Sequence, residues 1–268
     1  MYSIPKVIHY CWFGHNQLPE LAVKCIDSWK RTCPDYIIKE WNEDNFDINC
    51  CDYVREAYEA KKWAFVTDYV RLYVMVNEGG IYMDTDVEVI SSLDKFLVHR
   101  AFSGFENETM IPTGIMACEK GFPLFREMLE DYNGRHFRQK NKYDMTTNVE
   151  TITNLCKKHG FVGNNKKQNI EGFVIYPKDV FCPKDYMTGD IVLTNQTVTI
   201  HHFASSWYNK IEKYILRKKG LIDRYKGFKR FVLNIFITPF YLIVMIKVHG
   251  IKEAIKPYID KIYREKKR

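Results

Sequence analysis

A helix, a glycine turn and a short apolar strand in direct succession constrain the fold of this chain most strongly. A helical pattern over residues 62–77 is ended by Gly79-Gly80, and three apolar residues then form a short strand. Two carboxylates, Asp84 and Asp86, follow where this strand ends. Such a succession is typical of α/β sheets, in which ligands collect at the carboxyl ends of the strands.

The same alternation of strands and helices continues over the first two hundred residues. The predicted strands cover residues 7–13, 36–41, 81–83, 101–105, 113–117, 174–176 and 197–203. The predicted helices cover residues 19–32, 52–60, 62–77, 123–132 and 148–159. This order predicts an α/β fold in which helices flank a parallel or mixed sheet.

The charge of the chain divides near residue 209. Residues 1–209 carry 23 Lys and Arg against 28 Asp and Glu, a net charge of −5. Residues 210–268 carry 17 against 5, a net charge of +12. We therefore predict a mildly acidic α/β domain over 1–209 and a basic helical extension over 210–268. The basic extension indicates a membrane surface or another polyanion as its partner.

The basic extension also contains an apolar segment. Residues 231–246 are predominantly apolar, but Asn234 and Pro239 interrupt them, and the run is shorter than the ~20 residues that a spanning helix needs. Isoleucines then recur at helical spacing among Lys and Arg over residues 251–262. These patterns predict a segment lying in an anionic membrane interface and no nucleic-acid partner. A helix docked on the domain and a membrane-spanning helix are the alternatives.

The eight cysteines indicate no metal or disulfide framework. None stands in a Cys-x-x-Cys pair, and Cys50 and Cys51 are adjacent. No secretory leader precedes the first strand. We therefore expect reduced thiols, mostly buried as small apolar side chains, in a cytoplasmic protein at the inner face of the cell membrane.

Asp84 and Asp86 are candidates for a metal site. They are one residue apart, and alternate residues of a strand point to the same side. Both carboxylates can therefore face one site, where they suit a divalent cation that carries a diphosphate. Because Asp-x-Asp alone is a weak signal, an ordinary acidic turn is the alternative.

The helix before the glycine turn brings a charged pair towards the same place. On a helix, Asp68 and Arg71 lie side by side next to the small Ala64. Only one tight turn separates them from the carboxylates, so they are candidates for binding hydroxyls and neutralising charge beside a metal. An exposed ion pair that contributes little stability is the alternative.

Residues at the ends of the first and last strands complete the candidate site. Trp12 follows the first strand, where its ring suits either stacking on a nucleobase or a place in the core. His201 and His202 are adjacent, so they point to opposite faces of a strand and only one readily reaches the metal; a structural role is the alternative. Ser206 and Trp207 offer donors for phosphate oxygens.

Together these motifs resemble glycosyltransferase family 32, bacterial sugar transferases that share a catalytic core with the large clostridial glucosylating toxins. The resemblance covers residues 4–120 almost continuously and resumes at 200–207. It is carried by Ile4-Pro5-Lys6-Val7-Ile8-His9-Tyr10-Cys11-Trp12-Phe13-Gly14, Trp41-Asn42-Glu43, Trp63-Ala64-Phe65-x-x-Asp68-Tyr69-x-Arg71, Gly79-Gly80-Ile81-Tyr82-Met83-Asp84-Thr85-Asp86 and His201-His202 with Ser206-Trp207.

The resemblance implies a GT-A type, Rossmann-like mixed sheet and a nucleotide-sugar donor, for which a UDP-sugar is expected. It also implies retention of the anomeric configuration. Asp86 and His202, in preference to His201, would hold Mn²⁺ or Mg²⁺ at the diphosphate. Asp84 would bind ribose and sugar hydroxyls.

The same resemblance assigns the remaining residues. Asp68 and Arg71 would hold the donor sugar, and Trp12 would stack on the base. Ser206 and Trp207 would contact the leaving β-phosphate. The expected catalytic group therefore consists of Asp68, Arg71, Asp84 and Asp86.

The expected activity is metal-dependent hexosyl transfer to a glycan or lipid-linked oligosaccharide in surface or capsular polysaccharide synthesis. A haloacid-dehalogenase-like phosphatase with Asp84 as nucleophile is one alternative, but it leaves the 63–71 helix and Ser206-Trp207 without a role. An inactive membrane adaptor is another, and the presence of Asp68 and Arg71 beside the Asp-x-Asp motif argues against it.

Overall fold

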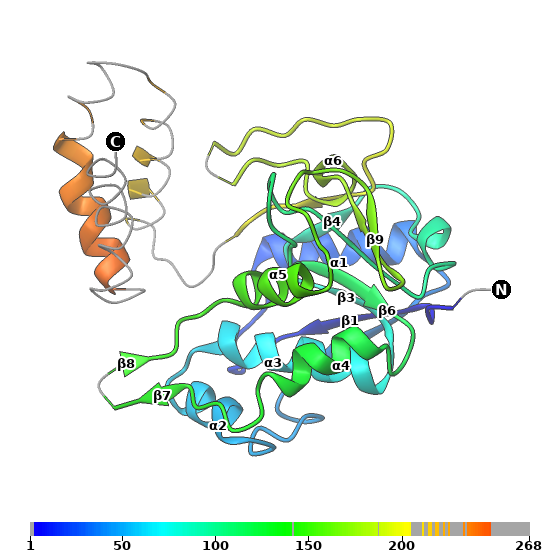
Figure 1. Ribbon diagram of the computed structural model, residues 1–268, viewed down its shortest axis with the longest axis horizontal. Helices are drawn as coiled ribbons and strands as arrows, with labels where there is room; N and C mark the ends of the chain where they lie inside the picture. Colours follow the sequence, from blue (N-terminus) through cyan, green and yellow to red (C-terminus); the bar gives the residue numbers. More distant parts are fainter. Residues whose placement is uncertain are drawn as a thin grey trace. The chain divides into compact units, whose positions relative to one another are not determined.

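The computed structural model describes residues 3–140, 142–186 and 188–204, individual positions between 211 and 233, and residues 235–247. The chain forms two units. One comprises Met1–Asp185 and Ile191–Phe203, and the other comprises Tyr186–Asp190 and Ala204–Arg268. The first unit contains the labelled strands and helices of Figure 1, and the second contains a helix over residues 235–247.

Seven strands of the first unit form one mixed sheet (Figure 1). In spatial order they are β2 (Ile37–Trp41), β1 (Val7–Cys11), β3 (Gly80–Met83), β6 (Ile115–Cys118), β5 (Ala101–Gly104), β10 (Phe173–Tyr176) and β9 (Gln168–Ile170). β1, β2 and β3 are parallel, β6 runs antiparallel to both β3 and β5, and β10 is parallel to β5. The predicted mixed α/β sheet is therefore confirmed.

Helices pack on both faces of this sheet. One face carries α2 (Asp52–Glu59), α3 (Trp63–Asn77), α4 (Pro123–Glu130) and α5 (Asn148–Lys158). The other face carries α1 (Glu20–Thr32), η1 (Asp94–Phe96), α6 (Lys178–Phe181) and a small sheet of β4 (Val87–Val89) and β11 (Thr199–His201). Because side chains alternate along a strand, Ile81 and Met83 join the α1 core and Tyr82 joins the α3 core.

Each strand and helix predicted within residues 1–209 is present, with bounds that differ by at most two residues. Several short elements were not predicted. They are β4, η1, α6, β9 and the hairpin of β7 (Arg138–Gln139) and β8 (Lys142–Tyr143). The predicted isoleucine-bearing helix at 251–262 lies outside the described residues.

A buried histidine joins β1 to β2 and to the glycine turn. The Nδ1 atom of His9 accepts a hydrogen bond from Trp41 Nε1 at 3.1 Å, and its Nε2 donates to the Gly79 carbonyl at 3.0 Å. This pattern requires the neutral imidazole, because the indole can only donate. Burial lowers the pKa of His9 to about 4. Gly80 has a φ of +100°, and a Cβ there would lie 2.8 Å from the Val7 carbonyl, so only glycine fits.

We predict that the free energy of unfolding decreases as the pH falls from 6.5 to about 4. In this window the unfolded chain binds a proton at His9 and the folded chain does not, so acid favours unfolding; the full difference amounts to about 3 kcal/mol. Urea unfolding at a series of pH values measures it. His9→Asn should flatten the slope, whereas His15→Asn, at an exposed imidazole, should not. An unchanged slope in His9→Asn would contradict the assignment.

Candidate functional site

A turn at the end of β3 brings Asp84 and Asp86 together. β3 ends at Met83, and Val87 N then donates to the Asp84 carbonyl at 3.0 Å as β4 begins. The Asp84 N–H is held by the Gly114 carbonyl at 2.8 Å. The two carboxylates do converge, but through this chain reversal and not through the strand alternation expected from the sequence.

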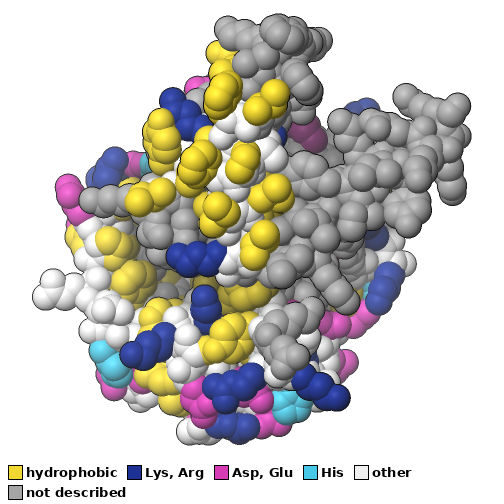
Figure 2. Space-filling model, turned by 90° about the vertical axis from the view of Figure 1, so that its left-hand side faces the viewer, with side chains coloured by type: hydrophobic (Ala, Val, Ile, Leu, Met, Phe, Trp, Pro, Cys, Tyr) yellow, Lys and Arg dark blue, Asp and Glu magenta, His cyan; other side chains and the backbone are white. Residues whose placement is uncertain are grey.

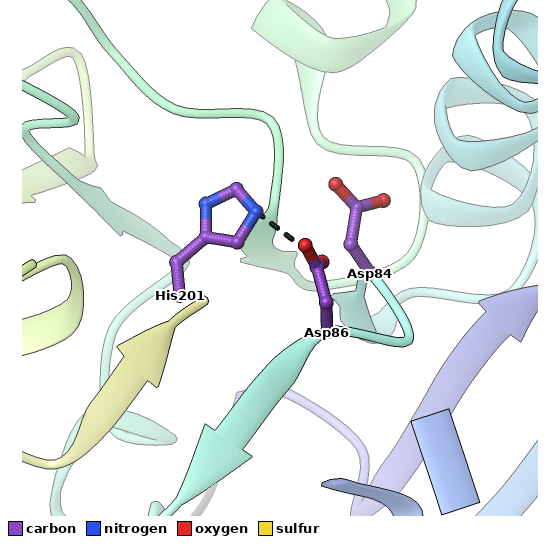
Figure 3. Close-up of side chains that lie close together, drawn as sticks. All are labelled: Asp84, Asp86 and His201. Carbon is purple, nitrogen blue, oxygen red and sulfur yellow. Dashed lines mark ion pairs between the residues drawn. The ribbon is translucent and has the colours of Figure 1, made fainter. Parts of the chain in front are cut away.

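His201 lies beside the two carboxylates (Figure 3). β11 pairs with β4 so that His201 is opposite Val87, and its Nε2 lies 3.3 Å from Asp86 Oδ1. One potential ligand atom from each of Asp84, Asp86 and His201 lies within 4.8 Å of the others. Gly114 makes room for the ring, because a Cβ there would lie 2.7 Å from His201 Cε1.

His202, which we expected at the metal, is directed elsewhere. Its Nε2 lies 2.8 Å from Glu88 Oε2, and its backbone N–H donates to the Asp86 carbonyl at 2.9 Å. The two histidines point to opposite faces because they are adjacent in an extended segment. The structure therefore places His201 with the carboxylates, which corrects the preference for His202.

The donor set fits a divalent cation. Burial opposes protonation of His201, but the charge of Asp86 outweighs it and raises the pKa of His201 well above its usual range. Its Nδ1 is buried and accepts or donates no hydrogen bond within the described part of the chain. Carboxylate oxygens suit Mn²⁺ or Mg²⁺, and neutral imidazole is a common metal ligand. Binding an ion through His201 would release its proton.

Arg71 connects α3 to the carboxylates. Its Nη2 lies 3.1 Å from Asp68 Oδ1, and its Nη1 lies 3.4 Å from Asp84 Oδ1. Nη1 also donates to the Thr113 carbonyl at 2.7 Å. The side chains of Arg71 and Asp68 are only 6% and 13% exposed. The alternative of a solvent-exposed ion pair is therefore wrong.

The position and charge of Asp68 are set by its surroundings. Burial raises the pKa of Asp68 to about 6, although the charge of Arg71 opposes this shift. Its backbone carbonyl accepts a hydrogen bond from Asn148 Nδ2 at 2.6 Å. Asn148 is fixed in turn by the Tyr132 hydroxyl, which donates to its Oδ1 at 2.6 Å. The start of α5 thus holds Asp68 in place.

Of the three remaining candidate residues, the structure describes only Trp12. Trp12 follows β1, is partly buried, and donates from Nε1 to the Asn16 carbonyl at 2.6 Å. It therefore lies at the carboxyl edge of the sheet without being enclosed in the core. Ser206 and Trp207 lie outside the described residues.

Glu106 is a neighbour of the site that sequence reasoning missed. It follows β5, which runs in the same direction as β3, so both strands end at the same edge of the sheet. Burial and the charge of Asp84 raise the pKa of Glu106, and His201 opposes this. The sequence did contain a signal for this residue. Glu106 comes directly after the strand predicted at 101–105, just as Asp84 comes directly after β3.

Comparison with known families agrees with this site. Residues 19–103 match the sequence model of a family described as "Glycosyltransferase sugar-binding region containing DXD motif". The matched region contains the paired Asp68 and Arg71 on α3 and the carboxylates of Asp84 and Asp86.

Individual relatives match over part of their length. Inositol phosphoceramide mannosyltransferase 3 of Schizosaccharomyces pombe is 28% identical over 133 residues, which cover 48% of this chain and 37% of that protein. Mannosyl phosphorylinositol ceramide synthase CSH1 of Saccharomyces cerevisiae is 27% identical over 155 residues, covering 52% and 37%. The chain thus spans little more than a third of the length of these curated relatives.

Among solved structures, the PaToxG glycosyltransferase is similar with a TM-score of 0.45 and 20% identity, covering 58% of this chain and 69% of that chain. The family match and the curated relatives support a glycosyltransferase of the Asp-x-Asp type. The Asp84, Asp86 and His201 group offers ligand atoms that fit a divalent metal.

We predict that Arg71→Met lowers the free energy of unfolding by about 3–5 kcal/mol, because it leaves buried carboxylates without their counter-charge. The double variant Asp68→Asn/Arg71→Met should recover part of this loss. Arg55→Met is the matched control, since Arg55 pairs with Asp52 at the same i,i+3 spacing but is exposed, and it should remain close to wild type. Denaturant unfolding measures all three. Equal effects of Arg71→Met and Arg55→Met would refute the buried-pair assignment.

Proposed function

We propose that this chain transfers a sugar from a nucleotide-sugar donor, a UDP-sugar in the first instance, to a glycan or lipid-linked acceptor. The observation that carries the proposal is the convergence of Asp84, Asp86 and His201 at the carboxyl edge of the sheet. The buried Arg71 lies against Asp84. The family match over residues 19–103 includes Arg71, Asp84 and Asp86 but not His201.

In this proposal each residue has a distinct task. Asp86 and His201 would hold the cation, and Asp84 would orient hydroxyls of the ribose and the sugar. A bound Mn²⁺ or Mg²⁺ would offset the negative charge that develops on the leaving diphosphate. Arg71 adds a fixed positive charge beside the same group, and Asp68 would accept hydrogen bonds from the donor sugar.

Further contacts would complete the donor site. The half-buried ring of Trp12 would stack on the base, and Ser206 and Trp207 would donate to the β-phosphate.

We propose retention of the anomeric configuration through same-face attack assisted by the leaving phosphate. The carboxylate of Asp68 is already paired with Arg71, and that of Asp84 accepts a hydrogen bond from Tyr82 at 2.8 Å, so neither is left as a free nucleophile.

The pairing of Asp84 also argues against the phosphatase alternative. In that reading Asp84 would attack a phosphoryl group, yet it is bound by Arg71 and Tyr82. An inactive adaptor would have no reason to keep Arg71 buried against two carboxylates, because an unpaired buried charge is costly.

We further assign the chain to glycosyltransferase family 32, related to the clostridial toxin core, with a role in surface or capsular polysaccharide synthesis. The yeast relatives are named for mannosyl transfer and for a ceramide-linked inositol phosphate. Both UDP- and GDP-sugars are therefore candidate donors, and an acceptor on a lipid is consistent with these names.

Donor hydrolysis over a panel of UDP- and GDP-sugars with Mn²⁺ tests the proposal. We expect one donor to be hydrolysed, the activity to vanish in EDTA, and Mn²⁺ to restore it. Asp86→Asn should reduce turnover by about a hundredfold or more while the fold is retained.

Glu88→Gln provides the control, because it makes the same carboxylate-to-amide change two residues away, where the side chain contacts His202 and not the ion site. It should leave turnover near that of wild type. Full turnover in excess EDTA, or in Asp86→Asn, would defeat the metal-dependent reading.

A further inference from the structure

The helix over residues 235–247 exposes an apolar face. The side chains of Phe236, Phe240 and Ile243 are 69%, 57% and 63% exposed. Positions i, i+4 and i+7 lie on one side of a helix. Figure 2 shows hydrophobic side chains gathered along this helix. Three large apolar side chains on one helical stripe form a surface that favours contact with an apolar phase.

Two other residues of the same helix are in a different situation. Val244 is only 3% exposed. The ring of Tyr241 lies 5.8 Å from the Nζ of Lys219, which belongs to another segment of that unit. At 100° per residue, Tyr241 points away from Phe236 and Ile243, whereas Val244, four residues after Phe240, lies at the border of the exposed stripe. The helix therefore has an outer apolar face that is exposed, and Val244 at its border is buried.

The charges around the helix indicate what covers its outer face. Between Asp223 and Glu253 the sequence contains no acidic residue, but it contains six Lys and Arg on the two sides of the apolar run. An anionic lipid surface supplies both an apolar layer for the stripe and negative headgroups for the flanking cations. A second copy of this basic segment would instead bring like charges together.

The structure describes residues 235–247 of this helix. Pro239 lies at the border of the apolar face and is itself exposed. No helix in the described part of the chain is long and apolar enough to cross a membrane.

We propose that Phe236, Phe240 and Ile243 insert into the boundary between headgroups and acyl chains of an anionic membrane, with the helix parallel to its plane. The occupant of this surface is thus lipid. Membrane binding itself is independent of sugar transfer; only the benefit to a lipid-carried acceptor rests on the proposed function.

Co-sedimentation of the full chain with vesicles of phosphatidylcholine and phosphatidylglycerol tests this. Phe236→Glu/Phe240→Glu should weaken binding by roughly tenfold or more, because two apolar contacts are lost. Val98→Glu/Val162→Glu is the control: it makes the same charge change at two residues that are each 56% exposed in the first unit. It should weaken binding by less than about threefold. Donor hydrolysis in solution should be unchanged in both.

A second measurement does not depend on a charged substitution. Phe240→Trp should gain fluorescence quenching by lipids with brominated acyl chains, whereas Val162→Trp should gain none. Equal weakening by both glutamate pairs, absence of quenching in the bound Phe240→Trp protein, or no vesicle binding by the wild type would each overturn the proposal. A dimer that dissociates in Phe236→Glu/Phe240→Glu, without vesicle binding, would assign the surface to a second copy.

Discussion

Arg71 carries a full positive charge into the interior of the domain, where an unpaired ion would be strongly destabilising. Its guanidinium is compensated by Asp68 on its own helix, by Asp84 at the end of β3, and by the Thr113 carbonyl. The Tyr82 ring adds a further favourable contact, with the guanidinium carbon 4.8 Å from its centroid. Because these groups come from α3, β3 and the segment before β6, the position of one charge fixes the relative position of three elements.

The candidate cation site is built on that arrangement. Asp84 is held by Arg71 and Tyr82, and the turn that follows it presents Asp86 to His201. His201 comes from the last strand of the domain, which returns to pair with β4. The site therefore forms only after the segment near residue 200 has folded back onto the turn after β3. Removing the β4–β11 pair would leave two carboxylates and no imidazole.

Local patterns in the sequence were sufficient to predict most of the fold. Strands such as β1 and β3 are short apolar runs next to glycine, and α3 ends at Gly79-Gly80, so their positions depend on neighbouring residues. β4, with only three residues, and the partly polar β9 were not predicted. β4 is stabilised by pairing with β11 at the far end of the domain, and β9 by pairing with β10 at the sheet edge. No periodicity within three residues reveals such a partner.

The residues of the candidate site likewise divide into those that neighbouring elements place and those that pairing with distant strands places. Asp68, Arg71 and Asp84 could be placed together from sequence, because a helix, a tight turn and a strand link them directly. The choice between His201 and His202 depends on the register of β11 against β4, and a shift of one residue exchanges the two faces of a strand. Glu106 was missed because its proximity to Asp84 depends on the order of β3, β6 and β5 in the sheet.

Electron spin-echo envelope modulation of Mn²⁺ bound together with UDP tests the central claim, that His201 holds the ion together with Asp86. The wild-type protein and His202→Gln should both show modulation from a directly coordinated imidazole nitrogen, because His202 faces Glu88 instead. His201→Gln should lose this modulation. A signal that persists in His201→Gln and disappears in His202→Gln, or an ion with no nitrogen ligand in the wild type, would contradict the account.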